Sequence, residues 1–121
     1  MRRIGEETTE QLDIVPARIQ VIRHIRPKYA CPRCEGAGVQ VAPLPPQPIP
    51  RSLASPGLLA WVATAKYVDG LPLHRTERIL QRLAVDIPRA TLAGWMIQLG
   101  TERLQPLINL MRECQLKGKL I

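Results

Sequence analysis

The fold is decided by LPLHRTERILQRLAVDIPRATLAGWMIQL, residues 71–99. Apolar residues recur at helical spacing in two separate parts of this stretch, which predicts two amphipathic helices. Residues 84–87 between them are too few for anything except a turn, and Pro88 suits a helix start because its missing N–H would find no partner there. The stretch therefore predicts a helix-turn-helix that buries Leu73, Ile79, Leu80 and Leu83 from the first helix and Leu92, Trp95, Met96 and Leu99 from the second.

Length and charge limit the class of protein. A chain of 121 residues suits one small domain, with or without an appendage, and is too short for a large enzyme core. Lys and Arg number 17 against 10 Asp and Glu, and the formal charge of +7 favours a polyanionic partner, most commonly nucleic acid. Aromatic residues make up only 3%, which argues against stacking on single strands. Without a signal peptide or a long apolar run, we expect a soluble cytoplasmic protein with no membrane partner.

The segment ARIQVIRHIRPKYA, residues 17–30, alternates apolar and polar side chains and predicts a half-buried strand of a β-hairpin. Basic residues and no acid occur between residues 18 and 33, so one edge of this segment is strongly positive. These side chains form either a phosphate-contacting patch or an ordinary solvated strand face. They are Arg18, Arg23, Arg26, Lys28 and Arg33.

A C-x-x-C pair, Cys31 and Cys34, follows this strand and has the form of a zinc knuckle. A structural zinc ion needs four thiolate or imidazole ligands, so the pair supplies half a site. His24, His74 and Cys114 are the remaining candidates, and an ordinary structural role is favoured for each. A redox role for the pair is weaker, because no βαβ pattern surrounds it.

Six prolines fall between residues 43 and 56, a composition typical of a semi-rigid extended spacer between domains. Recognition by a proline-binding module is the less favoured alternative. Ser55 and Pro56 then predict a helix start, and Gly70 predicts its end. Its predicted buried face consists of Leu58, Leu59, Val62 and Ala65, widened by Trp61 and Tyr67.

The last segment, residues 100–116, is also expected to be helical. Gly100 interrupts the preceding helix, and Pro106 starts a new helix near Gln105 or kinks a continuous one. Apolar residues gather on one side of this helix, at Leu104, Leu107, Ile108 and Met111.

The exposed side of the second motif helix carries Ala90, Gly94 and Ile97, which are poor readers of base edges. Arginines near it are better suited to phosphate than to bases. They are Arg75, Arg78, Arg82 and Arg89. The helical half is therefore expected to contact the DNA backbone, with a purely packing role as the alternative.

Three segments in order, namely RIGEETTEQLDIVPARIQVIRHIRPKYACPRCEG, APLPPQPIPRSLASPGLLAWVATAKYVDGLPLHRTERILQRL and IPRATLAGWM, resemble transposases of the insertion sequence 66 family. The resemblance implies a zinc-binding domain followed by helices that lead to a DDE-type catalytic domain. It carries over only Cys31 and Cys34 as zinc ligands, since the family's earlier C-x-x-C is not in this sequence. The aspartates, at 13, 69 and 86, match no catalytic motif, so the resemblance implies a fragment without catalytic residues of its own.

We therefore expect a mainly α fold, with a partial zinc-ribbon β-hairpin at residues 1–42, a proline-rich linker at 43–56 and a helical bundle with a helix-turn-helix at 57–121. The predicted function is the DNA-binding part of a DDE-type transposase that acts in transposition, with zinc as a half-complete cofactor site. Expected partners are double-stranded DNA at transposon ends, a second copy of the chain, or the remaining transposase chain. The alternatives are a non-catalytic protein–protein interaction module and a small helix-turn-helix transcriptional regulator.

Overall fold

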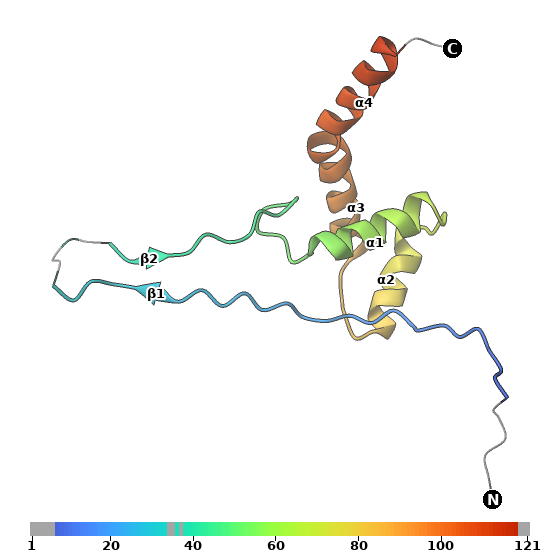
Figure 1. The fold of residues 1–121 in the computed structure, drawn as a ribbon, viewed down its shortest axis with the longest axis horizontal. Helices are drawn as coiled ribbons and strands as arrows, with labels where there is room; N and C mark the ends of the chain where they lie inside the picture. The colour runs from blue at the N-terminus through green and yellow to red at the C-terminus, as the bar shows by residue number, and fades with distance from the viewer. Residues whose placement is uncertain (1–6, 34–35, 37, 119–121) are drawn as a thin grey trace, which may run out of the picture.

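The computed structural model describes residues 7–33, 36 and 38–118 and consists of an extended N-terminal arm and a helical half (Figure 1). The elements are β1 (Lys28–Tyr29), β2 (Gln40–Val41), α1 (Pro56–Tyr67), α2 (Leu73–Arg82), α3 (Arg89–Gln98), a π-helical turn (Leu99–Arg103) and α4 (Gln105–Lys117). The expected mainly helical fold with a small hairpin near the N-terminus is confirmed.

The N-terminal arm is a long ribbon closed by a very short ladder. β1 and β2 are antiparallel, with Lys28 opposite Val41 and Tyr29 opposite Gln40. Close to the ladder, the Arg26 guanidinium donates a hydrogen bond to the carbonyl oxygen of Ala42 at 2.9 Å. Every described residue from 7 to 46 is exposed, so the half-buried strand predicted over residues 17–30 is wrong. An alternating strand buries one face only where a second layer covers it, and no described element covers this one.

α1 begins and ends where the local sequence predicts. The Ser55 hydroxyl accepts a hydrogen bond from the backbone N–H of Leu58 at 3.2 Å, which caps the first turn next to Pro56. At the other end Gly70 has φ +67°, a left-handed conformation that glycine adopts without strain. Leu59, Val62 and Ala65 are buried as expected, with Leu58 and Trp61 partly buried. Tyr67 was expected to widen the buried face but is 67% exposed, because it lies on the last turn beyond the core.

α2 and α3 form the predicted helix pair. The connecting turn includes Ala84 with φ +61°, and α3 starts directly after Pro88. Of the predicted buried positions, Leu80, Leu92, Trp95 and Met96 are buried, and Leu73, Ile79 and Leu99 are half-buried. Leu83 is 37% exposed because α2 has already ended at Arg82. Figure 1 shows the arrangement of these helices. The use of α2 and α3 as a helix-turn-helix DNA-binding motif stays a prediction.

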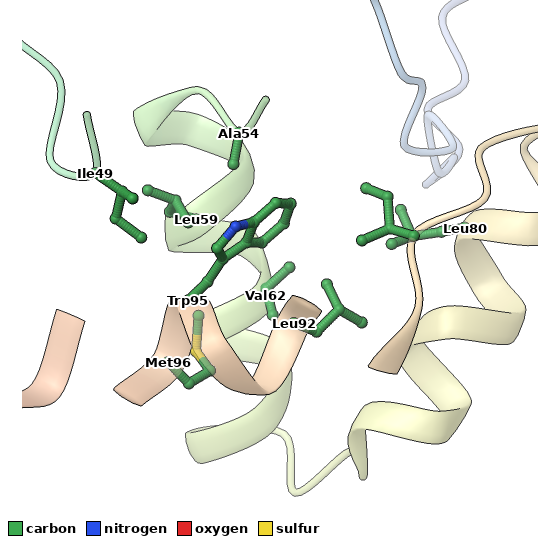
Figure 2. Packing of buried hydrophobic residues seen from close by; sticks show 9 residues of the cluster. Ile49, Ala54, Leu59, Val62, Leu80, Leu92, Trp95 and Met96 are labelled. Atoms are coloured by element: carbon green, nitrogen blue, oxygen red, sulfur yellow. The ribbon is translucent and has the colours of Figure 1, made fainter. Parts of the chain in front are cut away.

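The core lies between α1, α2 and α3 and includes the end of the proline-rich stretch (Figure 2). Ile49 and Ala54 pack against residues of the helices, although their segment has the composition of a spacer. Thr76 is the buried polar residue of the described chain, a position that apolar periodicity does not reveal. The buried cluster consists of Ile49, Ala54, Leu59, Val62, Leu80, Ile87, Leu92, Trp95 and Met96.

α4 projects away from this core (Figure 1). The π-helical turn contains Gly100 and separates α3 from α4, and Pro106 lies in the first turn of α4, as expected. α4 contains no buried residue and contacts only the π-helical turn among the described elements. The helical bundle therefore consists of three helices, with the fourth outside it. Within the described part of the chain, none of the helices has the length and apolar character needed to cross a membrane.

Candidate nucleic-acid interface

Three arginines share one exposed face of α2. Arg75, Arg78 and Arg82 are spaced by three and four residues, which places them on the same side of the helix over about 10 Å of its axis. Together with Leu71, His74 and Ile79 they line a shallow open groove. The sequence predicted these arginines as phosphate contacts, but it gave no indication that His74 lies among them.

The positive charge on this face is not neutralised by an ion pair among the described residues. None of the three guanidinium groups forms an ion pair with a carboxylate in the described part of the chain. The helix itself is held in place from its other side, where Thr76 and Leu80 are fully buried. A fixed row of uncompensated guanidinium groups is suited to binding an anion with regularly spaced charges, because each group can donate two parallel hydrogen bonds to one phosphate.

The fourth predicted arginine of the helical half lies apart from this row. Arg89 is the first residue of α3 and is exposed, but it does not line the groove of α2. The exposed side of α3 carries Ala90, Thr91, Ile97 and Gln98, so among these only Gln98 and Thr91 could hydrogen-bond to a base edge. α3 therefore offers little for reading a base sequence.

The basic residues of the N-terminal arm are exposed but not gathered. From Arg18 to Lys28 the chain is extended, and at about 3.3 Å per residue these two side chains are separated by about 30 Å. Arg26 already donates to the Ala42 carbonyl, so part of its donor capacity stabilises the hairpin. Arg23 and Arg33 are likewise exposed. The arm thus presents a line of charges rather than a compact patch.

The described residues do not by themselves make a zinc site. Cys31 lies exposed just after β1, and Cys34 is outside the described residues. In the described ranges, no group of three or more His, Cys, Asp and Glu side chains lies close enough to hold a metal ion. His24 lies on the arm, His74 on α2 and Cys114 on α4, so the structure does not bring these candidates together.

A second hollow lies where the end of the proline-rich stretch meets α3. Polar side chains in its lining come from Arg51, Asp86, Thr91 and Gln98, next to the buried Trp95. Arg51 has φ +60°, a left-handed conformation that is uncommon for a residue with a side chain. Sequence reasoning missed this hollow, because it depends on a contact between segments about 40 residues apart.

Two family profiles match the chain. Residues 51–121 match the profile described as "Transposase IS66 family", and residues 1–35 match "zinc-finger binding domain of transposase IS66". Together these matches include both the arm as far as the cysteine pair and the whole helical half.

Three proteins of Sinorhizobium fredii are similar to the chain. The uncharacterized protein y4qI is 42% identical over 118 residues, which cover 98% of this chain and 21% of y4qI. The uncharacterized protein y4jD is 42% identical over 95 residues, or 78% of this chain and 18% of y4jD. A third, y4hP, is 31% identical over 111 residues, or 92% of this chain and 20% of its own length. The chain therefore spans about a fifth of the length of these relatives. No solved structure matches it.

Proposed function

The chain belongs to the IS66 transposase family, and from this premise we propose that it serves transposition as a DNA-binding part that holds the duplex by its phosphate backbone. The observation that carries the proposal is the row of three exposed, unpaired arginines on α2. The net charge of +7 supports it, since a polyanion gains from every such group. The proposed ligand is double-stranded DNA at the ends of the transposon.

The α2 row is short enough for its arginines to reach neighbouring phosphates of one DNA strand. Phosphates advance by about 3.4 Å along the duplex axis per strand but lie farther apart along the strand itself, so a row of about 10 Å reaches about two of them directly. With α2 lying along the backbone, the long side chains of Arg75, Arg78 and Arg82 would contact two or three neighbouring phosphates. Contacts of this kind fix the position of a protein on DNA without reading its sequence. Because α3 exposes few base-reading side chains, we propose binding that depends weakly on sequence.

The extended arm supplies a second, weaker contact in this proposal. Its line of basic side chains could follow the backbone over a longer distance, but a two-residue ladder holds it less firmly than a packed helix. Arg18, Arg23 and Arg33 would be its phosphate contacts. Arg26 and Lys28 lie at the ladder, where one of them already hydrogen-bonds within the hairpin.

Zinc binding would need ligands besides Cys31 and Cys34, and strand cleavage would need a group of acidic residues. Cys31 and Cys34 would supply two thiolates, and a tetrahedral zinc ion would require two further ligands. Cleavage by a metal-dependent transposase needs several carboxylates around the metal, and in the described part of the chain no such group of acids is found. We therefore propose that this chain binds DNA and does not cut it.

A salt titration of duplex binding tests the proposal. Fluorescence anisotropy with a labelled 20-base-pair duplex, measured between about 50 and 200 mM salt, gives the slope of log K against log salt concentration. The triple variant Arg75→Gln, Arg78→Gln, Arg82→Gln should bind about 10- to 100-fold more weakly, and its slope should be shallower by about 2 to 3. The triple variant should lose the same affinity for two duplexes of unrelated sequence.

A charge-matched variant controls for net charge alone. Arg103→Gln, Arg112→Gln, Lys117→Gln removes the same three charges from the π-helical turn and α4, far along the chain from α2. This variant should lose less than about threefold in affinity. Equal losses for the two triple variants, or no duplex binding by the unaltered chain at 50 mM salt, would refute the α2 contact.

A further inference from the structure

α4 carries an apolar face that nothing in the described chain covers. Large apolar side chains at 107, 108, 110 and 111, with Leu104 just before the helix, are between 42% and 56% exposed, and Leu116 near its end is 80% exposed. The helix contacts only the π-helical turn, so the core of α1, α2 and α3 does not need this face. A patch of this kind on a helix outside the core marks an association surface.

The spacing of the apolar residues suits the pairing of two helices. Leu104, Leu107, Met111 and Cys114 follow one another at intervals of three, four and three residues. This is the a/d spacing that forms the seam of a two-stranded coiled coil, kept here over less than two heptads. Ile108 and Leu110 flank the seam and widen it. The seam contains no Lys, Arg, Asp or Glu.

We propose that this face pairs with the same face of a second copy of the chain, as a parallel, in-register helix pair. In an antiparallel pair, Arg103 of one copy would approach Lys117 of the other at the flanking positions, and like charges would oppose each other. In the parallel arrangement these two residues lie at opposite ends of the seam. Arg103 then faces Ile108 of the second copy, and Leu110 faces Gln115, so no like charges meet.

The area of the face agrees with a weak dimer. Five apolar side chains that are about half exposed, with Cys114, offer roughly 500 Å² per copy, so that a pair would bury roughly 1,000 Å² in total, at the lower limit for a specific interface. α4 has 13 residues, less than two heptads, which also limits the affinity. We therefore expect dissociation in the micromolar range. This pairing does not depend on the DNA-binding proposal, because it uses a different helix.

Sedimentation equilibrium between about 1 and 500 μM tests the pairing. The unaltered chain should pass from monomer to dimer over this range, and the double variant Leu107→Glu, Met111→Glu should remain monomeric throughout. Ile97→Glu, the same kind of change on the exposed side of α3, should dimerise like the unaltered chain. Circular dichroism should show the same melting of the core in all three, because none of the altered residues is buried.

Cys114 reports the direction and register of the helices. In a chain with Cys31→Ser and Cys34→Ser, a parallel pair places the two Cys114 thiols at the same level of the seam, within disulfide range. Dissolved oxygen with a copper catalyst should oxidise the two thiols to one disulfide and give a covalent dimer. A control chain, which also carries Cys114→Ser and Asn109→Cys, has its thiol on the outer side of α4. It should give at least about tenfold less covalent dimer.

Three results would overturn the proposal. The first is a monomer at all concentrations. The second is a dimer that the double variant does not weaken, since the contact would then lie elsewhere. The third is a dimer whose Cys114 thiols crosslink no better than the thiols at position 109, since the helices would then not run parallel in register.

Discussion

The extended arm and the helical half both contain many apolar residues, but those of the arm are exposed and many of those in the helical half are buried. In the arm, Val21 and Ile25 alternate with arginines and are 91% and 79% exposed. In the helical half, Leu80 and Leu92 are fully buried, because three helices converge on them. Apolar periodicity alone therefore does not create a core. A core forms only where several amphipathic elements can cover one another's faces within a short length of chain.

The same difference separates the two sets of arginines. Arg75, Arg78 and Arg82 project from a helix whose opposite side is anchored by Leu80, so their spacing is set by the helix. The basic residues of the arm follow an extended chain that is paired over only two residues per strand. A charged ligand that binds the α2 row therefore meets side chains whose backbone is already ordered, and the entropic cost of binding is lower there.

Removing a core side chain should produce the largest effect. Leu80→Ala leaves a cavity between α2 and the other helices and should lower the free energy of unfolding by about 3 kcal/mol. Val21→Ala, in the arm, should change it by less than about 0.5 kcal/mol, since no contact of a buried side chain is lost. Urea unfolding followed by circular dichroism at 222 nm measures both. Equal losses of unfolding free energy in the two variants would mean that the arm packs against other parts of the protein in solution.

The two sets of arginines can be compared directly in DNA binding. Arg18→Gln, Arg23→Gln, Arg33→Gln removes three charges from the arm, as many as the α2 triple variant removes from the helix. The α2 variant should lose about tenfold more affinity than the arm variant, a difference of about 1.4 kcal/mol. Anisotropy at one fixed salt concentration is sufficient. A larger loss for the arm variant would reverse the order of the two contacts and make the arm the main binding surface.

Local signals predicted the helical half well. Ser55 and Pro56 fix the start of α1, Gly70 fixes its end, and Pro106 lies in the first turn of α4, because caps and prolines act on their own neighbours. These features need no knowledge of distant segments.

Features that depend on distant segments could not be predicted. The burial of Ile49 and Ala54 comes from contact with helices that begin later in the chain, and a proline-rich composition gives no sign of it. The exposure of the arm likewise depends on the lack of a covering layer in the described chain. The zinc ligands stay a prediction, because Cys34 lies outside the described residues and no group of three or more His, Cys, Asp and Glu side chains is gathered in the described ranges.

Thr76 allows the smallest and sharpest comparison between the two regions. Its side chain is fully buried, and its hydroxyl oxygen has no hydrogen-bond partner among the described residues. A buried hydroxyl without a partner costs free energy, and valine has the same shape without the polar atom. Thr76→Val should therefore raise the free energy of unfolding by about 1 kcal/mol, since the two residues have similar helix propensities.

The same substitution in the arm controls for the change of residue type. Thr9→Val alters an exposed side chain and should leave the free energy of unfolding within about 0.3 kcal/mol of the unaltered chain. Thr76→Ser, which keeps the hydroxyl and removes the buried methyl group, should lower it by about 1 kcal/mol. Should Thr76→Val destabilise the protein instead, the hydroxyl must bind a buried water or another group, and the core would be less dry than the packing of α1, α2 and α3 implies.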